Sequence, residues 1–333
     1  MPCSTKQKTA FAVAVVVGLS ISTTGAWAQN EQPLKFDYVI HSSASNTFWQ
    51  AVRKGMYDAC AQEKAQCQMI FTQTEGSVSE QVGNLQAALA GKPDAIAVSI
   101  VDDKALDPIL KQARKNGVTV LAANVDSTAP DKASVREAFI GQGFQPAGYA
   151  LAQKLAERFP KSGPISVLVG ISAPGQNWSE QRGAGIMHFL ADYKAAHPDR
   201  NITWKRIDSG TDLAVTAERV GSYLNANPNT TAYFDTGYWH AGVAKALKDR
   251  GVPPGKILLA GFDIVPDVLN SMKAGYIQVE VDQQPYLQGY LPVIQAALIK
   301  KYKLAAWDVD TGKGLLLPDQ VDSVFDLSKK GYR

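Results

Sequence analysis

The sequence predicts an α/β protein made of two successive lobes, each a doubly wound parallel sheet. Short apolar runs rich in β-branched residues alternate with longer amphipathic segments from Lys35 onward. This alternation restarts once, after residue 124, and the whole chain of 333 residues is long enough for two hydrophobic cores. Such an alternation is typical of βαβ units around parallel sheets.

The first series of elements runs from residue 36 to residue 124. Its apolar runs have strand length, and its amphipathic segments have the length and the apolar spacing of helices. The expected strands are 36–40, 68–72, 95–100 and 118–124. The expected helices are 47–62, 78–90 and 103–117.

The second series repeats the pattern, and several of its helices end at a glycine or before a proline, as helix stop signals do. The expected strands are 138–140, 165–170, 202–207, 231–235, 257–263 and 277–282. The expected helices include 146–159, 179–196 and 213–226, and a long final helix covers 285–302. We place the join between the lobes near Asn124-Val125-Asp126.

Residues 1–28 have the pattern of a secretory signal peptide. Lys6 and Lys8 precede the apolar run 10–22, and Ala26-Trp27-Ala28 supplies the small residues before a cleavage site. The alternative is an N-terminal membrane anchor, but the apolar run is short for a membrane span. We therefore expect export to the periplasm and cleavage before Gln29.

The charge and the cysteines of the remaining chain restrict its partners. Loss of Lys6 and Lys8 lowers the formal net charge from +3 to +1, which gives no reason to expect nucleic acid or an anionic membrane as partner. Cys60 and Cys67 are the two cysteines outside the leader. In an oxidising compartment this pair favours a disulfide, and two buried free thiols are the alternative.

Motifs of enzymes and of metal sites are absent from the sequence. The segment from Gly170 to Pro174 fails the nucleophile-elbow pattern because a proline stands where a glycine is needed. The segment 141–148 lacks the last glycine of a dinucleotide fingerprint. The four histidines have no metal-ligand spacing. We therefore expect neither an enzyme, nor a cofactor, nor a bound metal.

Polar and aromatic residues gather where the predicted strands end. In open parallel sheets, ligands bind outside the carboxyl ends of the strands, so two such sheets predict a site in the cleft between them. Carboxylates, amides and a guanidinium match the hydroxyls of a sugar, and aromatic rings cover its C–H faces. The candidates are Asn46, Phe48, Trp49, Asp102, Asn124, Arg182, Asp263 and Gln283, with His41 as a secondary candidate.

The chain resembles the periplasmic sugar-binding proteins of ABC importers, of the ribose-binding type, which have the type I periplasmic binding protein fold. The motifs that carry the resemblance are SNTFWQAVRKG, AVSIVDDKAL, VTVLAANVD, SEQRGAG, LNANPNTTAYFD, LLAGFD and VDQQPYLQG. They extend over nearly the whole chain after the leader.

The resemblance implies both a hinge and residue roles. It implies a three-crossover hinge, with an N-terminal lobe of residues 29–124 plus 285–308 and a C-terminal lobe of 125–284 plus 309–333. Asn46 would bind a ring hydroxyl, and Phe48 and Trp49 would border the sugar. Asp102, Arg182 and Asp263 would bind hydroxyls, while Asn124 and Gln283 would add amides near the crossings.

One departure from the family bears on the identity of the ligand. Gly237 stands where ribose binders carry an asparagine, so that contact is missing or is replaced by Asp235, Tyr238 or Trp239. Trp178 is the candidate for the family's aromatic residue in the second lobe. The resemblance therefore implies another pentose, a hexose, a polyol, or a sugar-like signal such as a furanosyl autoinducer or a nucleoside.

The expected partners are a small sugar or polyol and an ABC transporter permease, with the protein acting as a monomer. The alternative is a ligand-sensing protein that presents its closed form to a chemoreceptor or a histidine kinase. Trp49→Ala is expected to weaken ligand binding by about 1–3 kcal/mol without affecting the core.

Overall fold

Two six-stranded sheets organise the chain in the computed structural model, which describes residues 1–4, 32–312 and 314–333. The predicted signal peptide falls almost entirely outside these residues. The N-terminal sheet has the order β11-β5-β4-β3-β1-β2 and all its strands are parallel. Its strands are β1 (Lys35–Ser43), β2 (Gln66–Thr72), β3 (Ala95–Val98), β4 (Thr119–Asn124), β5 (Ala138–Gly141) and β11 (Val309–Asp310).

The C-terminal sheet has the order β12-β10-β9-β8-β6-β7, and only the edge strand β12 is antiparallel. Its strands are β6 (Ile165–Ile171), β7 (Ile202–Asp208), β8 (Ala232–Asp235), β9 (Leu258–Phe262), β10 (Val279–Asp282) and β12 (Gly314–Leu316). The predicted fold class, two doubly wound parallel-sheet lobes, is therefore confirmed.

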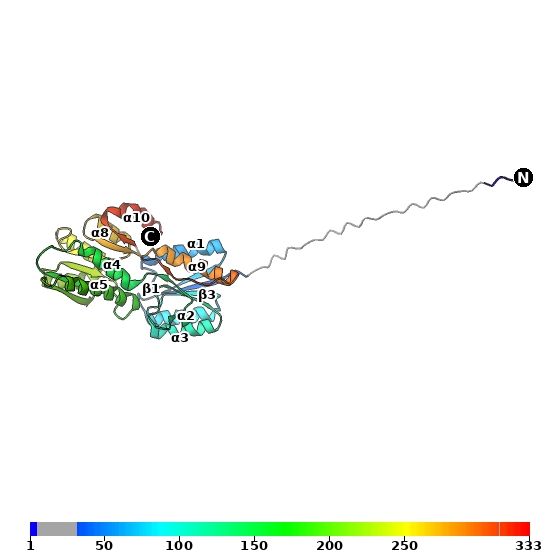
Figure 1. Ribbon diagram of the computed structural model, residues 1–333, viewed down its shortest axis with the longest axis horizontal. Helices are drawn as coiled ribbons and strands as arrows, with labels where there is room; N and C mark the ends of the chain where they lie inside the picture. Colours follow the sequence, from blue (N-terminus) through cyan, green and yellow to red (C-terminus); the bar gives the residue numbers. More distant parts are fainter. Residues whose placement is uncertain (5–31, 313) are drawn as a thin grey trace. The chain divides into compact units, whose positions relative to one another are not determined.

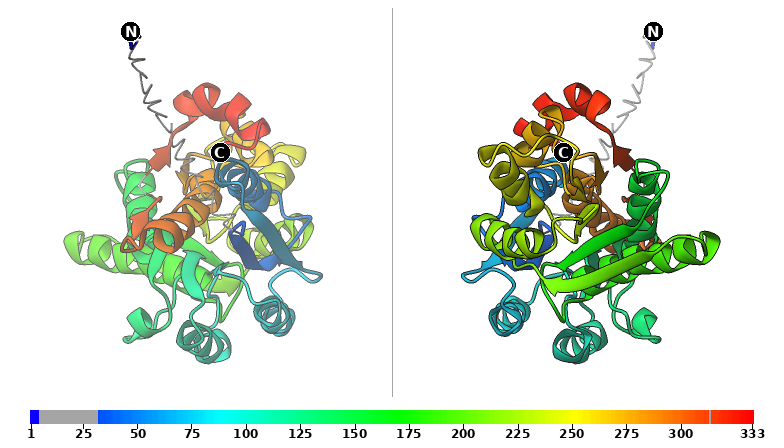
Figure 2. Two further views of the ribbon diagram at one scale, coloured as in Figure 1. Left: turned by 90° about the vertical axis from the view of Figure 1, so that its right-hand side faces the viewer. Right: turned by 90° about the vertical axis from the view of Figure 1, so that its left-hand side faces the viewer.

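Helices cover both faces of each sheet (Figure 1, Figure 2). In the N-terminal lobe, α1 (Phe48–Glu63) and α9 (Pro285–Tyr302) pack together on one face. The helices α2 (Val78–Ala90) and α3 (Asp103–Lys115) cover the other face. The C-terminal lobe contains α4 (Phe144–Ala156), α5 (Asn177–Ala196), α6 (Leu213–Ala226), α7 (His240–Asp249), α8 (Pro266–Lys273) and α10 (Val321–Lys329). Two short 3₁₀ helices are η1 (Lys132–Ser134) and η2 (Pro318–Gln320).

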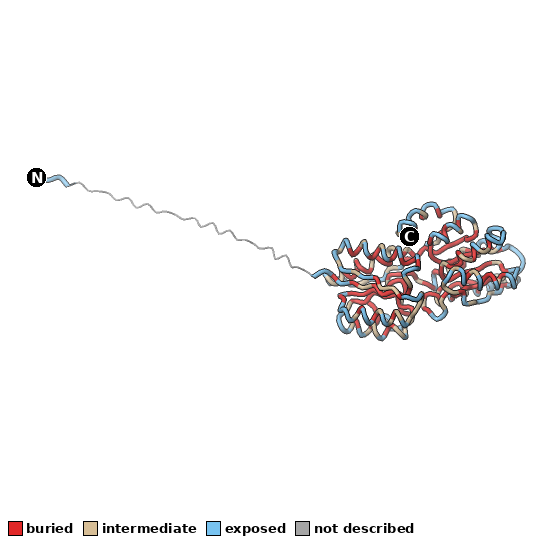
Figure 3. The backbone as a smooth tube through the Cα atoms, turned by 180° about the vertical axis from the view of Figure 1, so that it is seen from behind, coloured by how far each residue is buried: buried red, intermediate tan, exposed pale blue. Residues whose placement is uncertain are grey.

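The alternating side chains of the strands explain this layering. Along β1, Phe36, Tyr38 and Ile40 pack with α1 and α9, whereas Val39 packs with α2 and α3 on the opposite face. Successive side chains of a strand point to opposite faces, so a strand that is apolar at every position needs helices on both sides. Figure 3 shows the consequence, with buried strands in the middle and exposed outer surfaces on the helices.

The lobe boundaries differ from the predicted ones. Strand β5 pairs with β4, with Asn124 opposite Gly141, so the N-terminal sheet continues beyond the predicted join at residue 124. The reason is that Ala138 and Ile140 are buried in the N-terminal core, which brings the chain back to the same sheet after η1. The first crossing therefore lies at Gln142 and Gly143, before α4.

The other two crossings follow β10 and β11. The chain passes back at Gln283 and Gln284, between β10 and α9. β11 pairs with β5 in the N-terminal sheet, whereas β12 pairs with β10 in the C-terminal sheet. The third crossing therefore follows Asp310 instead of preceding Val309, because a two-residue strand first completes the N-terminal sheet.

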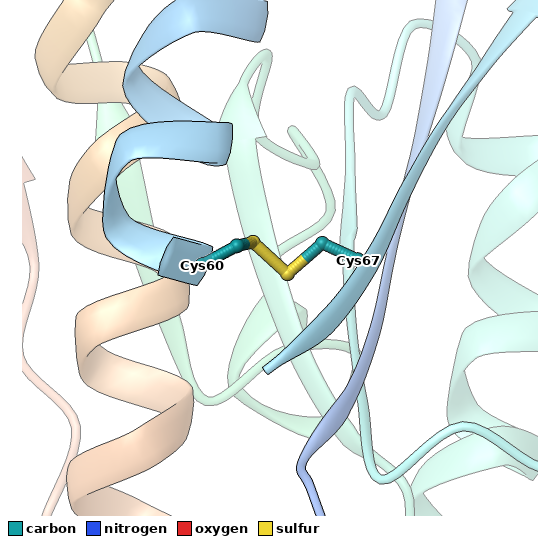
Figure 4. Close-up of a disulfide and its surroundings, with 2 residues drawn as sticks. All are labelled: Cys60 and Cys67. Atoms are coloured by element: carbon teal, nitrogen blue, oxygen red, sulfur yellow. A yellow bond between two sulfur atoms is a disulfide. The ribbon is translucent and has the colours of Figure 1, made fainter. Parts of the chain in front are cut away.

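The predicted disulfide between Cys60 and Cys67 is present, with 6.2 Å between the two Cα atoms (Figure 4). Cys60 lies in the last turns of α1 and Cys67 at the start of β2. Lys64 ends the helix in a left-handed conformation (φ 54°), which turns the chain back toward the sheet.

Within the described residues, no helix is both long and apolar enough to cross a membrane.

We expect the double substitution Cys60→Ser/Cys67→Ser to lower the free energy of unfolding by about 2 kcal/mol, because the short closed loop constrains the unfolded chain. The measurement is denaturant unfolding with and without a reductant. The double variant should match the reduced native protein and should itself be insensitive to the reductant. Equal stability of oxidised and reduced native protein would contradict the expectation.

Candidate functional site

A cavity with an empty volume of about 380 Å³, partly open to solvent, lies where the carboxyl ends of the two sheets meet. Side chains of both lobes and of the hinge line it. They are His41, Asn46, Phe48, Trp49, Glu75, Asn124, Trp178, Arg182, Gly237, Tyr238, Trp239, Asp263 and Gln283. Most of the residues predicted from the sequence are therefore brought together here. Asp102 and Asp235 are the two that do not line the cavity.

Asn46 organises the N-terminal wall. Its Oδ1 accepts a hydrogen bond from the backbone N–H of Phe48 (3.1 Å), in the first turn of α1. Its Nδ2 donates to Glu75 Oε1 (2.9 Å), and the hydroxyl of Tyr238 in the other lobe donates to Asn46 Oδ1 (3.3 Å). The amide thus fixes the loop after β1 and contacts both lobes at the cavity.

The aromatic residues form two groups that meet around the cavity. Phe48 and Trp49 pack edge to face with their ring centroids 5.3 Å apart. In the C-terminal lobe, Tyr238 stacks on Trp239 at 4.6 Å, and Trp239 lies 6.2 Å from Trp178. Rings of this kind offer apolar faces to the C–H groups of a ligand.

Trp49 is also part of the hydrophobic core, contrary to the expectation that its loss would leave the core intact. Its side chain is only 2% exposed and packs edge to face with Tyr38 in the N-terminal cluster. Trp49→Ala would therefore remove core packing as well as cavity wall. A loss of binding in that variant would not by itself report a ligand contact.

Trp239 occupies the space that a side chain at Gly237 would need. A β-carbon built on Gly237 would lie 2.1 Å from Cζ3 of the Trp239 ring. A larger residue at 237 therefore requires the tryptophan to move. Of the three residues named above as replacements for the missing asparagine, the structure places Trp239 in that space.

Arg182 is a buried cation at the base of the C-terminal wall, only 3% exposed. Its guanidinium lies over the rings of Phe262 (4.1 Å to the centroid) and Phe144 (4.8 Å). Its Nε donates to Gln142 Oε1 (3.1 Å) and its Nη1 to the carbonyl of Thr236 (2.9 Å). Burial lowers the pKa of Arg182 to about 10, so the group remains protonated at neutral pH.

Close packing of α4 on α5 sets the position of Arg182. A β-carbon on Gly148 would lie 2.2 Å from the carbonyl oxygen of Arg182, and one on Gly185 would lie 2.1 Å from that of Gln145. Only glycine permits the two backbones to approach so closely. The sequence Arg-Gly-Ala-Gly in α5 therefore brings the guanidinium against the hinge.

Asp263 faces Arg182 from the end of β9. It has a left-handed backbone (φ 77°), and its Oδ1 accepts a hydrogen bond from Gln283 Nε2 (2.5 Å). Burial raises the pKa of Asp263, and the positive charge of Arg182 together with the Gln283 bond opposes that shift. Strained backbone of this kind is common at ligand-binding positions.

The two remaining predicted residues have structural roles. Asp102 is the N-cap of α3, and its side chain accepts a hydrogen bond from the backbone N–H of Ala105 (3.0 Å). Asp235 is fully buried behind the cavity, where it accepts hydrogen bonds from Ser172, Tyr233 and Gly237. Asp102 Oδ1 and both carboxylate oxygens of Asp235 therefore already have donors within the protein.

Glu75 lines the cavity but was not among the residues predicted from the sequence. It lies in the loop between β2 and α2, past the end of its strand, in a segment rich in turn residues. Nothing in its immediate neighbourhood distinguishes it from an ordinary loop carboxylate. Its contact with Asn46 depends on two loops that the fold brings together.

In the described part of the chain, no group of three His, Cys, Asp or Glu side chains is arranged to hold a metal ion.

His41 makes the stability of the ligand-free protein depend on pH. Burial lowers the pKa of His41 from 6.5 to about 4, against the opposing effect of Glu75, and its Nδ1 lies 2.9 Å from Ser99 Oγ. Between pH 6.5 and 4 the unfolded chain takes up a proton that the folded chain does not. The free energy of unfolding should therefore fall by up to about 3 kcal/mol as the pH is lowered through this window.

This pH effect is measured as the difference between native protein and His41→Asn, because buried carboxyl groups with raised pKa values act in the opposite direction. Chemical unfolding at several pH values from 4 to 7 should show a weaker acid sensitivity in His41→Asn. His188→Asn, on the exposed face of α5, is the control and should follow the native profile. Parallel profiles for all three proteins would contradict the assignment.

Comparisons with known proteins agree with this architecture. A family model described as a periplasmic binding protein domain matches residues 38–303. The chain is 26% identical to the xylose/arabinose-binding protein XylF of Sulfolobus acidocaldarius, over 82% of this chain and 68% of that protein. It is 25% identical to the ribose import binding protein RbsB of Bacillus subtilis, over 84% and 90%.

Solved structures show the same fold. A solute-binding protein of an ABC transporter from Burkholderia graminis, in complex with D-arabinose, superposes with a TM-score of 0.76 at 26% identity. The match covers 87% of this chain and 97% of that one. The family consists of binding proteins, which agrees with the predicted lack of enzymatic activity. The resemblance inferred from the sequence is confirmed: this chain belongs to the periplasmic binding protein family and has its type I fold.

Proposed function

We propose that this protein captures a sugar or a sugar-like polyol in the cavity between its lobes and delivers it to an ABC importer. The observation that carries the proposal is the lining of the cavity. Asn46 of the N-terminal lobe, Arg182 and Asp263 of the C-terminal lobe and aromatic residues of both lobes line the same cavity. Amide, guanidinium and carboxylate groups provide both donors and acceptors, as vicinal hydroxyls require.

The relatives narrow the first choice of ligand. The relatives above are named for xylose, arabinose and ribose, so pentoses are tested first. Nucleosides and furanosyl signals remain the alternative ligands.

The lobes touch across the cavity, as a closed binding protein requires. The backbone N–H of Asn177, at the start of α5, donates to the carbonyl of Val101 (2.9 Å) in the other lobe. The side chain of Asn177 donates to the carbonyl of Ile100 (3.0 Å) and to Asp103 Oδ1 (2.7 Å). Bonds of this kind require the two lobes to be in contact, so we expect them to stabilise the closed form that a permease would recognise.

We expect the protein to act as a monomer in the periplasm after removal of residues 1–28. The signal-peptide pattern supports this location. Delivery to a permease and presentation to a chemoreceptor or kinase both use the closed form, so the binding experiments below apply to either role.

A first test of the proposed function uses Asp263. In titration calorimetry of residues 29–333 with pentoses, hexoses, polyols, nucleosides and furanones, we expect binding among the sugars and polyols. Asp263→Asn should weaken the best ligand by about 10- to 100-fold, because a charge-assisted hydrogen bond is lost. Asp102→Asn is the matched control, since asparagine caps a helix as well as aspartate does and Asp102 lies outside the cavity. Equal weakening in both variants would contradict the site, and binding of nucleosides alone would contradict the ligand class.

A second test concerns closure of the two lobes. Asn177→Ala removes two side-chain hydrogen bonds between the lobes and should weaken ligand binding by about 3- to 30-fold without touching the cavity. Small-angle scattering should show a more open ligand-free protein than the native one. Asn116→Ala, at the exposed end of α3, is the control. Native affinity together with a native scattering profile would show that these bonds do not stabilise closure.

A further inference from the structure

Glu75 places a carboxylate on the N-terminal wall of the cavity. Its Oε1 accepts hydrogen bonds from Ser42 Oγ (2.8 Å) and Asn46 Nδ2 (2.9 Å). Its Oε2 accepts from the backbone N–H of Ser43 (2.9 Å) and from the hydroxyls of Ser42 (2.7 Å) and Ser43 (3.0 Å). These contacts hold the side chain in one position. All the donors are neutral, so they orient the carboxylate without balancing its charge.

In the described part of the chain, no cation is paired with Glu75. No lysine or arginine nitrogen there lies within 4.0 Å of its carboxylate. The neighbouring His41 is neutral at pH 7, because burial lowers its pKa to about 4. Among the residues that the structure describes, Arg182 of the C-terminal lobe is the one arginine or lysine that lines the cavity.

The charge of Arg182 is already matched within its own lobe. Asp263 and Asp235 both act electrostatically on the guanidinium, and each of them raises its pKa against the effect of burial. Asp263 lies in the cavity wall together with Arg182, while Asp235 is fully buried. The cavity therefore has a balanced cation on the C-terminal side and an unbalanced anion on the N-terminal side.

Closure of the lobes makes this imbalance costly. Gln176 Nε2, in the C-terminal lobe, donates to the carbonyl of Gly76 (2.9 Å), the residue after Glu75. The C-terminal lobe therefore contacts the loop that carries the carboxylate, and Glu75 is half-buried there. A charge that loses contact with water without gaining an opposite charge is destabilising, whereas a cation in the ligand would offset that loss.

The aromatic residues of the cavity favour the same ligand. Trp49, Trp178, Tyr238 and Trp239 line it together with Glu75. The faces of tryptophan and tyrosine rings carry negative potential and attract an ammonium group within about 6 Å. A neutral sugar uses such rings only as apolar surfaces, but an amino sugar uses both their area and their charge distribution.

We propose that the solute carries a protonated amino group that binds Glu75, and that it is an amino-deoxy sugar or an aminated cyclitol. This inference rests on the proposed function and specifies the substrate class of the same cavity. Hydroxyls of the ring bind Arg182, Asp263 and Asn46, while the ammonium group supplies the charge that the N-terminal wall lacks.

The experiment is titration calorimetry at pH 7 with matched pairs that differ only in the amine. The probes are D-glucose and D-glucosamine, D-galactose and D-galactosamine, and myo-inositol and an inosamine. For at least one pair, the native protein should bind the amine 10-fold or more tightly than the hydroxyl compound. Added salt should weaken the amine and leave the hydroxyl compound almost unchanged.

The variant Glu75→Gln keeps the size of the side chain and one of its two acceptor oxygens, and removes its charge. The ratio of amine affinity to neutral-partner affinity should fall at least 10-fold in this variant. Glu80→Gln is the matched control. Glu80 accepts hydrogen bonds from the backbone of the same loop at Gln73 and Thr74 but does not line the cavity, so amine selectivity should be retained.

The outcomes separate this inference from the proposed function. Neutral sugars that bind as tightly as their amines, or a Glu75→Gln variant that weakens both members of a pair equally, would overturn the inference and leave a sugar-binding protein. Native-protein selectivity is decisive by itself if Glu75→Gln does not fold. Absence of binding to every neutral and every amine probe would overturn both.

Discussion

The hydrogen bonds around Gln283 connect the hinge of this protein to the wall of its cavity. Gln283 Nε2 donates to Asp263, while its Oε1 accepts from Gln288 Nε2 (3.1 Å) and Asn124 Nδ2 (3.4 Å). Gln288 Nε2 also donates to Thr311 Oγ1 (3.0 Å), in the third crossing. Because these groups are buried, each must find a partner inside the protein, so the amides link the crossings into a single network.

Interlobe geometry depends on this network. The two sheets meet at the carboxyl ends of their strands because the chain leaves and enters both sheets at the hinge, and each crossing adds polar groups at the same place. Thr311 N–H donates to the carbonyl of Gly141 (2.9 Å), which joins the third crossing to the end of β5. Asp263 is thus positioned by the hinge as much as by its own strand. Closure of the lobes and alignment of the binding groups are therefore coupled.

Several titratable side chains are buried in the C-terminal lobe. His240 Nε2 bonds to Glu280 Oε1, and both side chains are fully buried. Burial raises the pKa of Glu280 well above its ordinary value and lowers that of His240 to about 4, so both groups favour their neutral forms. Arg182 is the cation that the remaining carboxylates require. Such a cluster is stable only if its members remain paired, which favours a single well-defined arrangement of this wall.

The fold class, the pairing of Cys60 with Cys67 and most of the residues around the cavity could be predicted from the sequence. Apolar strands that alternate with amphipathic helices admit few arrangements. The carboxyl ends of parallel strands lie at one edge of a sheet, so the sequence could assign Arg182 and Asp263 to the cavity there. Cys60 and Cys67 lie close in sequence across one turn, so their pairing is a local property.

Features that depend on contacts between distant segments could not be predicted from the sequence. The N-terminal lobe extends to Gly141, beyond the predicted boundary at residue 124, because Ile140 is buried in the core of that lobe. Asp102 proved to be a helix cap, a role that has the same sequence signature as a ligand contact. The ring of Trp239 fills the space beside Gly237. Glu75 lines the cavity and accepts a hydrogen bond from Asn46. No local pattern encodes these positions, because each depends on how the fold places two separate loops or side chains against each other.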